Sequence, residues 1–182
     1  MIAALLAIAG TAEAQPSPIA EPVYHGILEV RRSLGSFDPD TGIASLKIRS
    51  WRFLLNPDTN QILPDQEPIV VDISENSLPL AAGMLTRSRN GKVFTYKAAR
   101  EDTTQPIRSL RIKQTRDAYR VSMTLRGLDF RSLINNDGSC LPIAVIIGDD
   151  DGFNGGIFTR PGFESRRLRI ARGCISAWPW ER

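Results

Sequence analysis

The alternation of apolar and polar side chains predicts β-strands over most of the chain. It is clearest over residues 119–126, where odd positions are apolar and even positions are polar or basic. Such a strand packs one side against a core and turns the other to water. Weaker versions of the same pattern occupy residues 28–31, 43–55, 69–73, 93–98 and 110–113. No apolar period of 3.6 residues persists for three turns, so long amphipathic helices are not expected.

Local breaks in this pattern predict specific backbone features. The apolar parity changes within residues 43–55, which predicts a β-bulge near Arg49 and Ser50. Asn90-Gly91 predicts a tight type I′ hairpin turn. Residues 141–148 lack charged side chains and are mostly β-branched, which predicts a strand buried on both faces. The glycines of residues 152–156 then predict a hairpin turn.

Short strands separated by frequent turns point to an all-β sandwich or barrel. We expect one antiparallel β-sandwich of about eight to ten strands over residues 23–182. The segments 68–75 and 142–149 share Pro, Ile, Val and Ile at equal offsets. This echo suggests two interlocked half-repeats, 24–99 and 107–174, within the single domain.

Residues 1–14 predict a signal peptide, because a short apolar core precedes Ala12-Glu13-Ala14. Residues 15–22 then form a flexible lead-in rich in Pro, Ala and Ser. The protein is therefore expected in the periplasm or outside the cell, with no transmembrane segment in its mature chain. The removed peptide holds one acid and no base, so the formal net charge rises from +3 to +4.

The chain has two cysteines, Cys140 and Cys174, and an exported chain favours their pairing as one disulfide. Such a bridge closes a loop of 34 residues, which the chain-entropy account values at about 3–4 kcal/mol. The single histidine, His25, is distant in sequence. A Cys–His nucleophile or a Cys/His zinc site therefore lacks its usual residues.

Several segments resemble a module of exported bacterial proteins of unknown function. They are residues 78–85, 91–96, 121–129 and 142–150, and the resemblance extends over residues 43–171. In those proteins the modules often occur in series and are taken to be Ig-like β-sandwiches. The resemblance implies an Ig-like fold here and brings no catalytic residues. A single copy and a cysteine pair distinguish this chain from the serial pattern.

Two groups of residues suggest ligand binding, each with a plainer alternative. Asp149, Asp151 and Asn154, beside Asp150, offer oxygens for Ca²⁺, although the same residues suit a solvated hairpin. Trp178 and Trp180 offer flat rings for a sugar, although such residues more often cover the end of a core.

A third group is a basic stripe on the water-facing side of one hairpin: Arg111, Lys113, Arg120 and Arg126. No aromatic residues interleave with this stripe, so nucleic acid is not an expected partner. We interpret it as a solvated face that discourages edge-to-edge pairing of sheets, and we expect no salt-dependent binding to heparin or DNA.

No G-x-S-x-G, H-E-x-x-H or phosphate-loop motif occurs in the chain. The first functional hypothesis is an exported, non-catalytic module with a structural or interaction role, whose partner is a protein or a cell-surface glycan. The second is a ligand-binding module for Ca²⁺ or carbohydrate. The third is a hydrolase built on a carboxylate pair that meets only in space.

Overall fold

The computed structural model describes residues 24–31, 33–133, 140–159 and 167–174, with the backbone alone for 153–159 and 171–174. The predictions for residues 1–14 and 15–22, and for Trp178 and Trp180, lie outside these ranges. The all-β prediction is confirmed. The strands are β1 (Tyr24–Glu29), β2 (Ser33–Phe37), β3 (Ile43–Leu54), β4 (Ile69–Ile73), β5 (Asn76–Leu80), β6 (Thr86–Arg87), β7 (Val93–Lys97), β8 (Ile107–Gln114), β9 (Tyr119–Asp129), β10 (Cys140–Ile147), β11 (Asp150–Thr159) and β12 (Arg167–Cys174).

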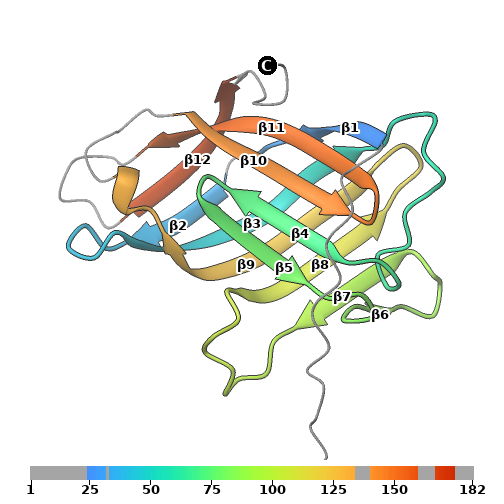
Figure 1. Ribbon diagram of the computed structural model, residues 1–182, viewed down its shortest axis with the longest axis horizontal. Helices are drawn as coiled ribbons and strands as arrows, with labels where there is room; N and C mark the ends of the chain where they lie inside the picture. The colour runs from blue at the N-terminus through green and yellow to red at the C-terminus, as the bar shows by residue number, and fades with distance from the viewer. Residues whose placement is uncertain (1–23, 32, 134–139, 160–166, 175–182) are drawn as a thin grey trace, which may run out of the picture.

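Hydrogen bonds join all twelve described strands into one curled sheet (Figure 1). Ten of them follow the order β5-β4-β10-β11-β1-β3-β9-β8-β7-β6, while β12 and β2 form a second path from β11 to β3. The strand number exceeds the expected eight to ten because short strands add to it, among them β6 with 2 residues. Within the described residues, no helix is long and apolar enough to cross a membrane.

The sheet is mixed, which corrects the prediction of a wholly antiparallel fold. β1 runs antiparallel to β3 and parallel to β11. The reason is topological: β11 and β3 are linked through three antiparallel pairings, so they run in opposite directions. A strand inserted between two such neighbours must be parallel to one of them.

The core lies inside the curl, between the arm of β4, β5 and β10 and the arm of β3, β9 and β8 (Figure 1). Trp51, Phe53 and Phe130 are its largest fully buried side chains, together with Phe37. The pairing does not divide the described strands into two sheets. The structure therefore shows a continuous curled sheet, and the two-sheet sandwich stays a prediction.

Two local predictions are confirmed and a third is confirmed in part. The register of β3 against β9 shifts between Ile48 and Trp51, which places a bulge at the predicted point and keeps both side chains buried. The odd residues of β9 from Tyr119 to Leu125 are buried and its two arginines, Arg120 and Arg126, are exposed. β10 lies between β4 and β11 and is fully buried on one face, at Ile143, Val145 and Ile147, whereas on its other face Pro142 is exposed and Ile146 is half-buried.

Two turn predictions are wrong. The β10–β11 turn is made by Gly148 and Asp149, since Ile147 already pairs with Asp150, and the glycines after Asp151 belong to β11. Gly152 is needed for packing, because a Cβ atom there would lie 2.5 Å from the Phe53 ring. The turn at Asn90-Gly91 is a longer loop closed by Ser88 and Val93, in which only Gly91 has a positive φ.

Cys140 begins β10 and Cys174 ends β12, and both strands pair with β11. Cys140 lies opposite Ile157 and Cys174 lies opposite Gly155. The side chain of Cys174 is outside the described side chains, so the disulfide stays a prediction.

Candidate functional site: a basic face and an acidic end

The outward side chains of β3, β9, β8 and β7 form an exposed surface of basic and hydroxyl groups. We call it the outer basic face, and sheet register arranges it in three rows. The rows are Lys47–Thr124–Ser109–Lys97, Arg49–Ser122–Arg111–Thr95 and Arg52–Arg120–Lys113. The predicted stripe on β8 and β9 lies on this face, and Arg126 continues it opposite Ser45.

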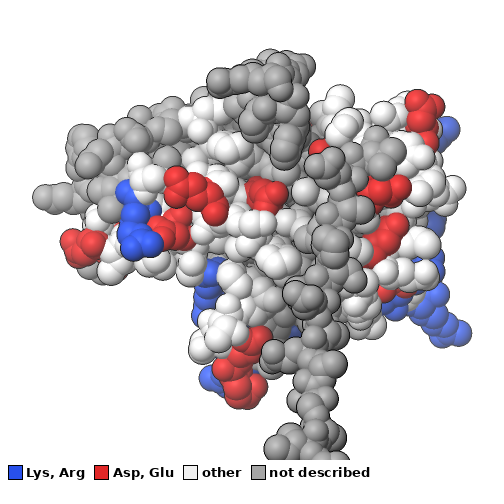
Figure 2. Space-filling model, viewed as in Figure 1, with Lys and Arg blue, Asp and Glu red and all other residues white. Residues whose placement is uncertain are grey.

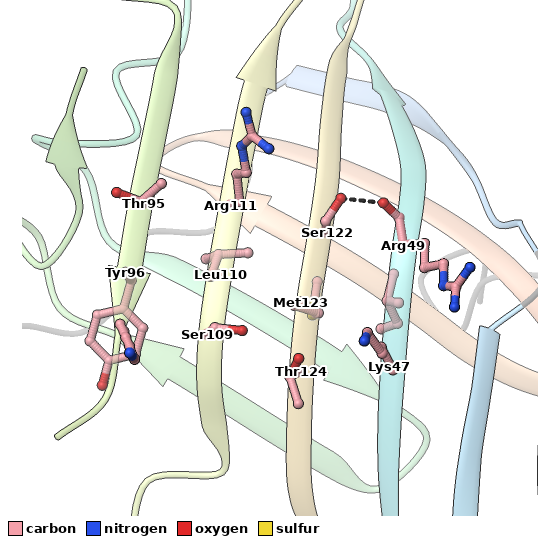
Figure 3. A pocket seen from close by; sticks show the side chains of 12 residues that line it. Lys47, Arg49, Thr95, Tyr96, Ser109, Leu110, Arg111, Ser122, Met123 and Thr124 are labelled. Carbon is pink, nitrogen blue, oxygen red and sulfur yellow. Dashed lines mark hydrogen bonds between the residues drawn. The ribbon is translucent and has the colours of Figure 1, made fainter. Parts of the chain in front are cut away.

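A shallow groove of about 620 Å³ runs over the first two rows (Figure 3). The side chains of Arg111, Ser122 and Thr124 stand out from the sheet, while Leu110 and Met123 turn toward the core (Figure 3). Ser122 Oγ donates to the carbonyl of Arg49, which holds β9 to β3 at the bulge. Neighbouring strands lie about 4.8 Å apart, so Lys47 and Lys97 are about 14 Å apart across the groove.

Almost none of these cations is neutralised by a carboxylate. In the described part of the chain, Arg52 alone on this face forms ion pairs, with Glu29 and Asp117 at 3.0 Å each. Lys113 lies directly opposite Arg120, which lies directly opposite Arg52. Like charges in directly opposed positions destabilise a sheet pair. The like charges of the third row therefore make the fold less stable than hydroxyl or acidic residues at these positions would.

The opposite face differs in charge. Figure 2 shows the side of β4, β5 and β10, where acidic side chains lie among uncharged atoms and basic ones lie mainly toward the margins.

A second concentration of charge, which we call the acidic end, lies at the β10–β11 turn. Thr59 Oγ1 donates to Asp150 Oδ2 at 2.7 Å, and Asn60 Nδ2 donates to Asp149 Oδ2 at 3.3 Å. The amide of Leu63 donates to Glu67 Oε2 at 2.6 Å. The first two contacts fasten the β3–β4 loop to the turn, and the third lies within the loop.

Burial of the carboxylates at the acidic end lowers the stability of the folded state. Asp150 is 1% exposed, and its Oδ1 has no hydrogen-bond partner among the described residues. Burial, with the nearby carboxylates of Asp149 and Asp151, raises the pKa of Asp150 despite the Thr59 hydrogen bond. Burial, Asp149, Asp150 and Asp65 likewise raise the pKa of Glu67, against the Leu63 hydrogen bond.

Two of the three predicted calcium residues have other partners in the fold. Asp149 contacts Asn60, whereas Asp151 Oδ1 lies 3.0 Å from Nδ1 of His25. Asp150 and Asp151 are adjacent in β11 and so face opposite sides of the sheet. No three His, Cys, Asp or Glu side chains among those described are placed to hold a metal ion. Only the backbone of Asn154 is described, so the calcium site stays a prediction.

Sequence reasoning missed Lys47, Arg49 and Lys97 as members of the basic face. The alternation within each strand predicts that these side chains point outward. It does not predict which residues lie beside them on the face, because the pairing of β3 with β9 and of β7 with β8 is long-range. Glu67 was missed for the same reason, since it meets Asp149 and Asp150 only in the fold.

Comparisons with models of known protein families, with curated proteins and with solved structures find no match. The functional conclusion therefore depends on the charge and geometry of the outer basic face and the acidic end.

Proposed function

We propose that this protein is an exported, non-catalytic binding module that holds a polyanionic macromolecule on its outer basic face. The observation that carries the proposal, and that revises the interpretation of a merely solvated face, is the third row, where Lys113 and Arg120 are directly opposed and neither forms an ion pair with a described residue. An anionic ligand supplies the missing counter-charge. The repulsion is then a cost of the free protein that binding removes.

The neighbouring rows support a ligand with hydrogen-bonding groups as well as charge. Ser109, Ser122 and Thr124 lie among the cations, and a hydroxyl can donate and accept, although the Ser122 hydroxyl already donates to the carbonyl of Arg49. Among the described residues, the face has no exposed aromatic platform, since Tyr96 is 9% exposed. Single-stranded nucleic acid is bound largely by base stacking on such platforms, so it is the less suitable polyanion.

Export and the closed fold belong to the same proposal. Export is supported by the apolar segment and small residues at positions 2–14. We further propose that the two arms of the sheet act as the layers of an Ig-like sandwich tied by Cys140–Cys174. The support is that no described cysteine is free and that the chain holds one other cysteine. Peptide mapping without reduction tests the bridge.

The binding proposal is tested by retention on immobilised heparin, a sulfated polyanion, under a salt gradient. We expect wild-type protein to bind at low salt and elute as salt screens the contacts. The double variant Lys113→Gln/Arg120→Gln should bind about tenfold more weakly, since each exposed ion pair contributes up to about 1 kcal/mol.

The matched control is Arg89→Gln/Arg100→Gln, which removes the same charge from exposed positions outside the three rows. We expect this control to bind nearly as the wild type does. Equal weakening by both double variants would show that net charge alone drives retention and would overturn the proposal. Absence of binding at low salt would overturn it as well.

A further inference from the structure

A small cleft opens at the end of the outer basic face, between the β3–β4 loop and the β8–β9 turn. Its volume is about 330 Å³, within the range of small-ligand sites. Leu55, Pro57 and Ala118 give it an apolar lining, and polar side chains of both segments complete it. Asp117 lines the cleft and accepts from Arg52, so the cleft adjoins the third row of the face.

Some polar side chains of the cleft already form hydrogen bonds within the protein, and others do not. Asn56 is used, because its amide donates to His25 O and its Oδ1 accepts from the Asp58 amide. Thr115 is also used, since its hydroxyl donates to Ala118 O at 2.6 Å. The side chains of Gln61, Gln114 and Arg116 have no hydrogen-bond partner among the described residues.

Gln61 is the second observation that points to a ligand. Its φ is 78°, which makes it one of two non-glycine residues with positive φ in the described chain. A non-glycine residue held there costs about 1–3 kcal/mol, and such residues gather at ligand-binding loops. Glycine would relieve the strain but would remove the amide from the cleft.

We infer that the cleft binds one carboxylated sugar residue, which makes the ligand of the outer basic face an acidic polysaccharide. This inference rests on the proposed function and narrows it to one ligand class. The two glutamine amides donate to and accept from sugar hydroxyls, and Arg116 pairs with the carboxylate. The apolar lining contacts the carbon face of the sugar ring. The rows of the face then hold the carboxylates that follow along the chain.

The test is calorimetric titration of the full chain with trigalacturonate and with the neutral galactose trisaccharide. We expect the neutral sugar to bind about tenfold more weakly, because it leaves Arg116 without its ionic partner. Gln61→Gly and Gln114→Ala should each weaken trigalacturonate binding several-fold. Gln61→Gly should also leave the protein as stable or more stable, which separates lost binding from lost folding. Gln66→Ala is the matched control, since Gln66 is exposed in the same loop outside the cleft.

Heparin binding by the same variants separates this inference from the proposed function. Heparin retention with equal affinity for the charged and neutral trisaccharides would overturn the sugar site and leave the basic face standing. Trigalacturonate binding that Gln61→Gly and Gln114→Ala leave unchanged would also overturn the site. Absence of heparin binding by the wild-type protein would overturn the proposed function itself.

Discussion

The outer basic face and the acidic end both place like charges close together, but under opposite conditions. On the face, Lys113 and Arg120 are exposed, and water and salt screen their repulsion. At the acidic end, Asp150 is buried and its neighbours Asp149 and Asp151 carry the same charge. The acidic end has compensating hydrogen bonds from Thr59 and Leu63, whereas the face has few.

The difference separates a structural role from a binding role. Carboxylates that accept from a loop hold that loop in place, even at an electrostatic cost. Cations that project into water without partners are free to contact something else. The hydrogen bonds of the acidic end therefore hold the β3–β4 loop, which also forms one wall of the cleft lined by Gln61 and Gln114. The face is the surface that we propose for ligand binding.

The largest effect should come from Gly148→Ala at the acidic end. Gly148 has φ 61°, and a Cβ atom there would lie 2.8 Å from the Glu67 side chain. We expect unfolding free energy to fall by about 1–3 kcal/mol, from backbone strain and displacement of Glu67. Gly83→Ala is the control, because its φ is 80° with no atom within 4 Å of the added Cβ. Equal losses in chemical denaturation would show that Glu67 contributes nothing.

Asp150→Asn should act in the other direction. The amide oxygen keeps the Thr59 hydrogen bond while the substitution removes a buried charge. We expect the free energy of unfolding at neutral pH to rise by about 1 kcal/mol. Thr59→Val, which removes the donor and keeps the charge, should lower it. A loss of stability in Asp150→Asn, measured by urea denaturation, would contradict the account of the acidic end.

The pH dependence of stability follows from the raised pKa values of Asp150 and Glu67. A carboxyl with a raised pKa binds its proton more tightly in the folded state. Stability should therefore fall as pH rises from the ordinary carboxyl pKa of about 4 through the raised value, and then level off. Thermal melts from acidic to neutral pH should show a smaller fall in Asp150→Asn. An identical profile in the two proteins would exclude Asp150 as a source of the slope.

The smallest effect belongs to the basic face. Lys113→Gln removes one member of a directly opposed pair, so the free energy of unfolding should rise by about 0.2–1 kcal/mol. The gain should shrink at high salt. Arg111→Gln is the comparison, because Arg111 lies opposite Ser122 and Thr95 rather than another cation. Denaturation at low and high salt measures both variants, and an equal gain would argue against pairwise repulsion.

The sequence predicts much of the local structure and little of its assembly. Alternation predicts which side chains of β9 are buried, and a parity change predicts the bulge of β3. It does not predict that β1 lies between β11 and β3, because that placement depends on pairings across the whole chain. The glycines of β11 suggested a turn, but Gly152 makes room for Phe53 instead.

The candidate site, too, could be predicted from the sequence only in part. Four cations on β8 and β9 were predictable, because neighbouring strands of a hairpin share a face. Their continuation through Lys47 and Lys97 depends on the long-range register of β3 and on β7. The strained backbone of Gln61 has no signal in the sequence, since glutamine does not usually mark a positive φ.

The most direct test measures both the free energy of unfolding and the heparin affinity of one double variant, Lys113→Gln/Arg120→Gln. We expect this variant to unfold at a higher denaturant concentration than wild type and to bind heparin about tenfold more weakly. The two changes together would show that the opposed cations lower the stability of the free protein and contribute to ligand binding. A gain in stability with unchanged affinity would show that the opposed cations have no part in binding, and would contradict the account.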